Sequence, residues 1–345
     1  MLQKKLVHSW NLQALGWEFL SRHRFAGQPY HGFNEIGRRF SLRVREQLQS
    51  RKDLNDESIF YAYDTGALEC FAWCQQKKIR CVLNQMDPNR TEVELVRAEE
   101  KKWPGWSLHT LEVPEAYFAR REQEWVLADR IIVNSDFSRT ALLRQGVPAE
   151  KLIVIPLCYE ADPANPMSKI ENRKLPLRVL FLGQVILRKG IQYLLAAAHK
   201  LVTENIQFDI VGPLGISETA VKTAPHNVIF HGRVSRDQVA DWYQKSNLFV
   251  LPTLSDGFAL TQIEAMAYGL PVIATPNCGE VVTDGLDGFI VPAYEADLLV
   301  DAFRRYLAQP ELLQEQSIAA REKARQFNLS RLAGNLARLE ASLQK

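Results

Sequence analysis

The chain has 345 residues, of which 46% are apolar and 24% charged, and its formal net charge at pH 7 is +2. This length suits two domains of about 150 residues each, and the composition is typical of a globular protein in water. The near-neutral balance argues against nucleic acid as a partner. No run approaches about 18 apolar residues, so we predict neither a transmembrane helix nor a signal peptide.

The first part of the chain is basic. Residues 1–52 contain ten Lys or Arg against three acids, a net charge of +7. We favour a solvated helical surface as the explanation, and the alternative is peripheral attachment to the anionic inner face of a membrane. Residues 1–57 contain no strand pattern. We therefore expect a shortened first domain that lacks its initial strands, or a chain that begins downstream of the true start.

From residue 58 onward, short apolar runs alternate with amphipathic stretches. The predicted strands of this half are 58–64, 79–85, 130–135 and 151–156, and the predicted helices are 66–78, 90–103 and 138–146. Repeats of strand, helix and strand at this spacing predict a parallel sheet covered by helices.

The alternation restarts after a segment with three prolines and no periodicity. The predicted strands there are 177–183, 206–212, 228–232, 247–252 and 271–275, and the predicted helices include 190–204, a capped helix within 235–246, and 259–268. We therefore divide the chain into a first domain (1–160), a linker (161–176), a second domain (177–325) and a terminal helix (326–345) that we expect to return to the first domain.

Five cysteines without a CxxC pair predict buried free thiols and a reducing, cytoplasmic setting. The seven histidines show no metal-ligand spacing, so we predict no metal site and no cofactor.

Two adjacent cations follow the first strand of the second half. Gly183 ends this strand, and Arg188 and Lys189 come directly before the next helix. Ligands bind at the carboxyl ends of parallel strands, where two cations suit a diphosphate. Taken alone, a solvated Arg-Lys pair is the simpler explanation.

The stretch SDGFALTQIEAMAYGLPVIAT, residues 255–275, combines a packed helix with two acids. Leu260, Ile263 and Ala267 have core spacing on the predicted helix. Asp256 has the usual chemistry of an N-cap. Glu264, in contrast, lies among small and apolar residues, where a solvated surface acid is not expected. Both acids are suited to hydrogen-bond sugar hydroxyls.

These segments, with IQFDIVG, VIFHGRVSRDQVADWYQKSNLFVLP and GEVVTDGLDGFIVP, resemble the carboxyl-terminal half of the retaining family 4 glycosyltransferases (glycosyl transferases group 1). The resemblance runs from about 177 to 310 and continues more weakly back to about 58. It implies the GT-B fold, with two Rossmann-like α/β domains facing across a cleft. It also implies metal-independent transfer of a sugar, with retention, from a nucleotide-diphosphate sugar to a hydroxyl of a glycan, a lipid-linked sugar or a small molecule.

The resemblance assigns roles to individual residues. It implies that Asp256 contacts the donor's hexose and that Lys189, with Arg188, stabilises the leaving diphosphate. Donor binding is implied for Gly183, for Arg233 and Val234 beside the base, for the backbone amides of Gly257, Phe258, Ala259 and Leu260, and for Glu264 at the ribose. Asp87 is implied on the acceptor side.

Some positions depart from the family pattern. Met86 stands where the family has histidine, Gln184 where it has arginine, and Asp256 where it has glutamate, and no glycine-rich loop is visible near the start. These departures leave an alternative function, a non-catalytic nucleotide-sugar-binding partner or regulatory protein. An epimerase would need acidic catalytic groups that the first half does not reveal, and a dehydrogenase is disfavoured because no GxGxxG follows a strand.

Overall fold

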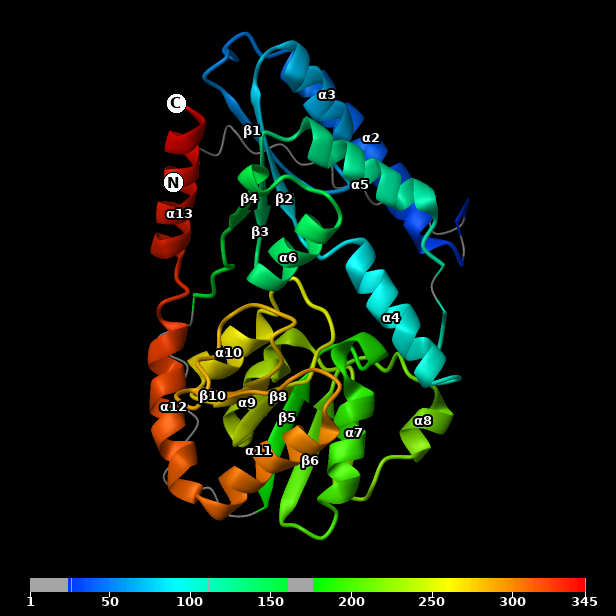
Figure 1. Cartoon of the computed structure of the whole chain (residues 1–345), viewed down its shortest axis with the longest axis vertical. Helices are drawn as coiled ribbons and strands as arrows, with labels where there is room; N and C mark the ends of the chain where they lie inside the picture. Colours follow the sequence, from blue (N-terminus) through cyan, green and yellow to red (C-terminus); the bar gives the residue numbers. More distant parts are fainter. Residues whose placement is uncertain (1–23, 26, 111, 161–175, 345) are drawn as a thin grey trace. The chain divides into compact units, whose positions relative to one another are not determined.

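The computed structural model describes residues 24–25, 27–110, 112–160 and 176–344 (Figure 1). The predicted linker 161–176 therefore lies almost entirely outside the described residues, as does most of 1–52 before residue 24. The described chain forms two compact units. The first unit ends at Gln85 and resumes over 112–132, and the second contains 86–110 and everything from Val133 onward.

The first unit contains most of a four-stranded sheet. Its elements are α2 (Pro29–Gln49), β1 (Ile59–Tyr63), α3 (Leu68–Gln76), β2 (Arg80–Gln85), α5 (Glu115–Leu127) and β3 (Arg130–Val133). The strand order is β1-β2-β3-β4, with β4 at Leu152–Val154, and β1 runs parallel to β2 from Ile59↔Arg80 to Tyr63↔Asn84. The boundary between the two units falls within β3.

The second unit contains a larger sheet. The strands of this larger sheet are β5 (Leu177–Leu182), β6 (Ile206–Val211), β7 (Val228–Gly232), β8 (Leu248–Leu251), β9 (Val272–Ala274) and β10 (Gly288–Ile290). Its α-helices are α4 (Arg90–Lys102), α6 (Asp136–Arg144), α7 (Ile191–Lys200), α8 (Glu218–Lys222), α9 (Val239–Lys245), α10 (Thr261–Ala267), α11 (Ala296–Ala308), α12 (Pro310–Ala324) and α13 (Leu329–Leu343). The short 3-10 turns are η2 (Ala149–Lys151), η4 (Leu187–Lys189) and η5 (Arg236–Gln238).

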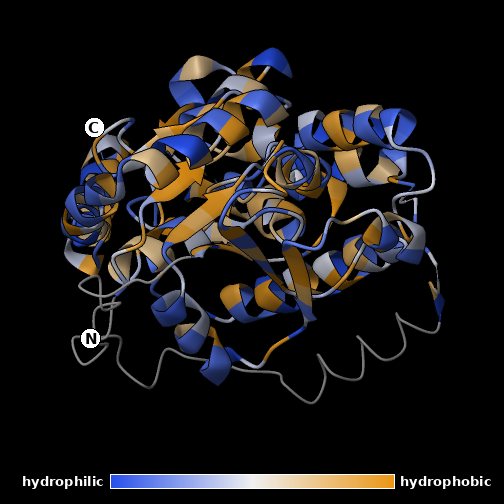
Figure 2. Cartoon of the chain, turned by 90° about the horizontal axis from the view of Figure 1, so that it is seen from below, coloured by the Kyte–Doolittle hydropathy of each residue, from blue (hydrophilic) through white to orange (hydrophobic). Residues whose placement is uncertain are grey.

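This sheet is parallel throughout, with strand order β10-β9-β8-β5-β6-β7. Its strands are largely apolar (orange in Figure 2), because helices bury both of its faces. Val179 and Phe181 of β5 pack in the cluster that includes α7 and α11, whereas Leu180 between them packs with α9, α10 and α12. The predicted parallel α/β fold is thus confirmed.

Most predicted strands and helices are present within a few residues of their expected bounds, and the capping box of Ser235 and Gln238 forms. The elements that were not predicted include the helices α5, α8, α11 and α12 and the strand β10. In α5, Arg121 pairs with Asp64, Arg120 binds Glu69 at 2.6 Å, and Glu124 accepts hydrogen bonds from three backbone amides. The buried face of α5 carries these charged residues. Helices were predicted from an apolar stripe, so this helix was missed.

Within the described ranges, no helix is long and apolar enough to cross a membrane. Nor do three or more His, Cys, Asp or Glu side chains in these ranges gather closely enough to hold a metal ion.

The core of the second unit gives a direct test of the fold. Phe303 of α11 is fully buried, with its ring 5.1 Å from that of Phe208 in β6. Phe303→Ala should lower the free energy of unfolding by about 3–5 kcal/mol, because it removes buried apolar area and leaves a cavity. Urea denaturation measures the change. Ile318→Ala, at a side chain that is 59% exposed, should change stability by less than about 1 kcal/mol.

Candidate functional site

The two predicted cations lie on η4, the turn between β5 and α7. Gly190, which follows them, has φ +74° and lies so close to Pro252 that a Cβ there would overlap the proline carbonyl oxygen. The backbone N–H of Leu254 donates to the carbonyl of Arg188 at 2.8 Å. Glycine thus allows η4 to pack against the segment that follows β8, and this packing brings the cations to the stretch 252–257.

An ion-pair network joins the two segments. Lys189 Nζ pairs with Asp256 Oδ2, and Arg188 Nη1 lies 3.9 Å from the same oxygen. Arg188 Nη1 also donates to the carbonyl of Ser255 at 2.9 Å. Burial raises the pKa of Asp256, but the charges of Lys189 and Arg188 outweigh burial and hold this pKa below its usual value. Asp256 is therefore a buried, ionised carboxylate between two cations.

A fourth charged group in the network was not predicted. Glu92 of α4 accepts a hydrogen bond from Ser255 Oγ at 3.0 Å, and its carboxylate lies 3.4 Å from Arg188 Nη1. The sequence gives no signal for this role, since Glu92 reads as one of several acids on a charged helix.

The segment before α4 also lies at the site. A Cβ at Gly257 would overlap the Met86 carbonyl oxygen and would lie 3.7 Å from the Cα of Asp87. Asp87 Oδ1 accepts from the backbone N–H of Asn89 at 2.8 Å, which shapes the turn into α4. The structure thus brings Asp87, predicted on the acceptor side, next to the Asp256–Gly257 turn.

The second predicted acid, Glu264, lies on α10 and is held by a buried tyrosine. The hydroxyl of Tyr243 donates to Glu264 Oε2 at 2.9 Å. Tyr243 is 1% exposed, and its ring stacks on Tyr268 with centroids 5.2 Å apart. Tyr243 comes from α9, and no pattern in the sequence singled it out. The tyrosine fixes the orientation of a carboxylate that is otherwise partly open to solvent.

The turn between the two acids differs from the prediction. Helix α10 begins at Thr261 rather than near residue 259, because Ala259 has φ +64° and interrupts the helix. The expected core face was therefore partly wrong, since Ile263 is buried but Leu260 is 38% exposed and Ala267 is half-buried.

The backbone amides of the turn have different environments. Phe258 N–H donates to Asp256 Oδ1 at 3.3 Å. In the described part of the chain, the N–H groups of Gly257, Ala259 and Leu260 have no hydrogen-bond partner.

The remaining predicted residues lie at the carboxyl ends of strands in the same sheet. Gly183 follows β5 and donates its N–H to Val211 at 3.0 Å. Arg233 and Val234 follow β7, the first exposed and the second half-buried. Within the described ranges, no hydrogen bond or ion pair links Arg233 or Val234 to Asp256, Glu264 or the two cations.

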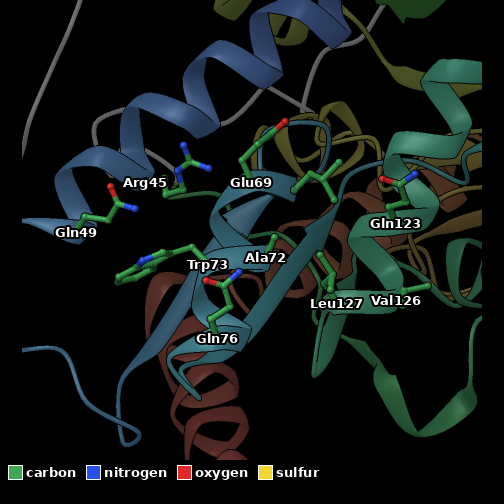
Figure 3. Close-up of a pocket in the computed structure, with 10 residues that line it drawn as sticks. Arg45, Gln49, Glu69, Ala72, Trp73, Gln76, Gln123, Val126 and Leu127 are labelled. Atoms are coloured by element: carbon green, nitrogen blue, oxygen red, sulfur yellow. The ribbon is translucent and has the colours of Figure 1, made fainter.

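Two surface cavities lie elsewhere, in the first unit. One, of about 580 Å³, is lined by side chains of α2, α3 and α5, among them Arg45, Trp73 and Gln123 (Figure 3). The other, of about 540 Å³, is lined by α2 and β1 and is strongly aromatic, with Tyr61 and Tyr63. None of the predicted site residues lines either cavity.

The α/β fold is of the GT-B type. Two solved structures illustrate the likeness in fold. HepE of Anabaena, in complex with UDP, has a TM-score of 0.65 at 18% identity over 88% of this chain and 82% of its own. Sucrose-phosphate synthase of Thermosynechococcus elongatus has a TM-score of 0.63 at 21% identity over 90% of this chain and 78% of its own.

Sequence comparison finds a family match over part of the chain. Residues 176–309 match the model for glycosyl transferases group 1. The chain's relatives include a D-inositol 3-phosphate glycosyltransferase of Streptomyces griseus, 33% identical over 58% of this chain and 48% of the relative. An uncharacterized 41.2 kDa protein in the cps region of Klebsiella pneumoniae is 26% identical over 50% of each chain. The chain thus spans about half the length of these curated relatives.

Packing at Gly190 can be tested against a matched glycine. Gly190→Ala should destabilise the protein by about 1–3 kcal/mol more than Gly285→Ala, measured by chemical denaturation. Both glycines have φ near +75°, but a Cβ at Gly285 would meet nothing within 4 Å, whereas at Gly190 it would overlap the Pro252 carbonyl. An equal loss of unfolding free energy in the two variants would show that Gly190 is not packed tightly against Pro252.

Proposed function

We propose that the protein is a retaining glycosyltransferase that moves a sugar from a nucleotide-diphosphate donor to a hydroxyl of a glycan, a lipid-linked sugar or a small molecule. The observation that carries the proposal is the convergence of Lys189, Arg188 and Asp256 within the family-matched part of the chain. In this proposal the second domain binds the donor, the first domain binds the acceptor, and the terminal helix returns to the first domain.

The proposed donor contacts follow from charge and geometry. Lys189 and Arg188 would face the diphosphate, and Glu264, oriented by Tyr243, would accept hydrogen bonds from the ribose hydroxyls. Arg233 would lie beside the base. Structures of Anabaena HepE contain UDP and UDP-glucose, so uridine nucleotides are the first donors to test.

The proposed chemistry separates the sugar from the diphosphate. The bond between the anomeric carbon and the diphosphate oxygen breaks, the acceptor oxygen bonds to the same face of that carbon, and the proton of the acceptor hydroxyl passes to the leaving diphosphate. Negative charge grows on the leaving diphosphate, where Lys189 and Arg188 would stabilise it. Asp256 would position the hexose and keep Lys189 ordered before the donor arrives. We infer metal independence from the family resemblance, so a chelator should leave turnover unchanged.

A second candidate function is nucleotide-sugar binding without transfer. It is favoured by Met86, which replaces the histidine of the family pattern and whose backbone lies against Gly257. Such a protein would act as a partner or regulator of an active enzyme. The two functions share the donor site and differ only in turnover.

We also propose a cytoplasmic location, with the basic residues 1–52 as the candidate membrane contact. Within the described part of this segment, Arg38 and Arg39 both bind Glu35, at 3.0 and 2.6 Å, and Arg43 binds Glu46 at 2.7 Å. These pairs within α2 reduce its effective positive charge. They support the solvated helical surface over membrane attachment.

Donor binding depends on Glu264 in this proposal. Glu264→Ala should weaken binding of UDP-glucose or another nucleotide sugar about 10- to 100-fold, because a hydrogen bond to a charged group contributes about 1.5–3 kcal/mol. Calorimetry with a panel of nucleotide sugars measures the change. The control is Glu315→Ala, an exposed glutamate on α12, which should bind like the wild type. Unchanged affinity in the Glu264 variant would remove this residue from the site.

Asp256 separates binding from transfer. Asp256→Asn should lower the release of nucleoside diphosphate by at least about 100-fold, because it removes the carboxylate that contacts the sugar and orders Lys189. Its donor affinity should be equal or tighter, since a negative charge near the phosphates is lost. Asp241→Asn, at an exposed aspartate of α9, is the matched control. A wild-type protein that binds donor without turnover on any acceptor would support the non-catalytic function instead.

A further inference from the structure

The proposed function leaves Glu92 of α4 unexplained. This carboxylate is mostly buried, with a side chain that is 23% exposed, and it contacts Arg188 and Ser255 beside the Lys189–Asp256 pair. It belongs to the segment 86–92, which lies against Gly257. The Glu92 carboxylate therefore pairs with Arg188, one of the two cations that a bound diphosphate would need.

The charges at this site make the conflict explicit. Arg188 and Lys189 supply two positive charges, which Asp256 and Glu92 balance with two negative charges when both are ionised. A diphosphate brings further negative charge into the same buried volume. Like charges at short range in a desolvated site repel strongly. One carboxylate must therefore lose its charge or its place before the donor is held well.

Glu92 is better suited to this change than Asp256. Asp256 pairs directly with Lys189 and lies near Arg188. Among the described residues, the carboxylate of Glu92 has only the 3.4 Å contact with Arg188 and the neutral hydroxyl of Ser255. Asp256 is thus held in its charged form by two cations. Protonation of Glu92 leaves the Lys189–Asp256 pair intact.

The geometry of α4 supports a local change at Glu92. Glu99, seven residues and about two turns further along the same helix, is fully buried. It accepts from Tyr193 Oη at 2.8 Å and from Gln192 Nε2 at 3.0 Å, both on α7. Glu99 thus fixes α4 against α7, so Glu92 can release Arg188 by a side-chain movement while the helix stays in place.

We propose that Glu92 is a proton-linked gate of the donor site. When ionised, it holds Arg188 in the empty protein, and when protonated, it releases Arg188 to the diphosphate of a nucleotide sugar. This inference rests on the proposed donor site. It makes Glu92 a positioning residue that acts through Arg188, and it makes donor binding coupled to uptake of a proton.

The sign of the pH dependence follows from linkage. Burial raises the pKa of Glu92 above its usual value, Arg188 opposes this shift, and Asp87 and Asp256 add to it. A bound diphosphate raises the pKa of Glu92 further. Donor affinity is then highest below the pKa of the empty protein. It falls as pH rises between the two pKa values, by up to about tenfold per pH unit, and levels off above the higher one.

Glu92→Gln tests the gate, because glutamine has the same shape and cannot ionise. Calorimetry with UDP-glucose, UDP-N-acetylglucosamine and GDP-mannose at pH 5 to 8.5 provides the affinities. Nucleotide sugars are used because the terminal phosphate of a free nucleotide titrates near pH 6 itself. The variant should bind about 3- to 10-fold tighter than wild type at pH 8, with little pH dependence. Titrations in two buffers of different ionisation enthalpy should show proton uptake by wild type that the variant lacks.

Glu94→Gln is the matched control, since Glu94 is exposed on the same helix. It should keep the wild-type affinity and pH profile. The gate would be wrong if Glu92→Gln bound the nucleotide sugars more weakly than wild type, or if its affinity depended on pH as that of wild type does. Either result would still be consistent with the proposed donor site.

A donor-independent measurement separates failure of the gate from failure of the proposed function. A raised carboxyl pKa in the folded protein means that ionised Glu92 costs stability as pH rises through that pKa. Glu92→Gln should therefore unfold about 2–4 °C above wild type at pH 8, with no difference near pH 4. If wild type binds no nucleotide sugar but the difference in unfolding temperature is present, the proposed function is wrong, whereas the raised pKa of the buried Glu92 carboxylate is supported. If the shift is absent, the gate fails whatever the donor.

Discussion

The buried pair of Lys189 and Asp256 is the interaction on which the site of this protein depends. The two residues come from the ends of neighbouring strands, β5 and β8, and the glycine at 190 lets their segments touch. An ionised carboxylate that is buried needs a charged partner, and Asp256 has one directly and a second nearby. The pair therefore fixes where the cations lie before any ligand is present.

This pairing has a consequence for binding. Cations held by carboxylates are ordered but not available, so an anionic ligand must compete with Asp256 and Glu92 for them. Such competition lowers affinity and makes binding depend on the protonation of the weaker partner. The charges of Arg188 and Lys189 thus stabilise the empty site, and the same charges would bind a diphosphate in the proposed function.

The sequence predicted the parallel α/β fold and most of its strands because buried parallel strands are short, continuous apolar runs. It failed for α5, whose interior face carries Arg120, Arg121 and Glu124. It also placed the start of α10 too early. Ala259 has a left-handed backbone, a conformation that a sequence usually indicates with a glycine, and here the residue is alanine. Both failures occur where paired charges or an unusual backbone replace the ordinary apolar pattern.

The sequence by itself determined which residues of the second half of the chain are candidates for the site. Asp256, Arg188 and Lys189 follow strand ends, which converge in a parallel sheet whatever the details of packing, and Glu264 lies on the helix α10 that comes next. Only the tertiary structure decided that Tyr243 orients Glu264 and that Glu92 from α4 holds Arg188. These contacts join residues 21 and 96 positions apart. No local pattern encodes them, because they arise from how separate helices pack against the same loops.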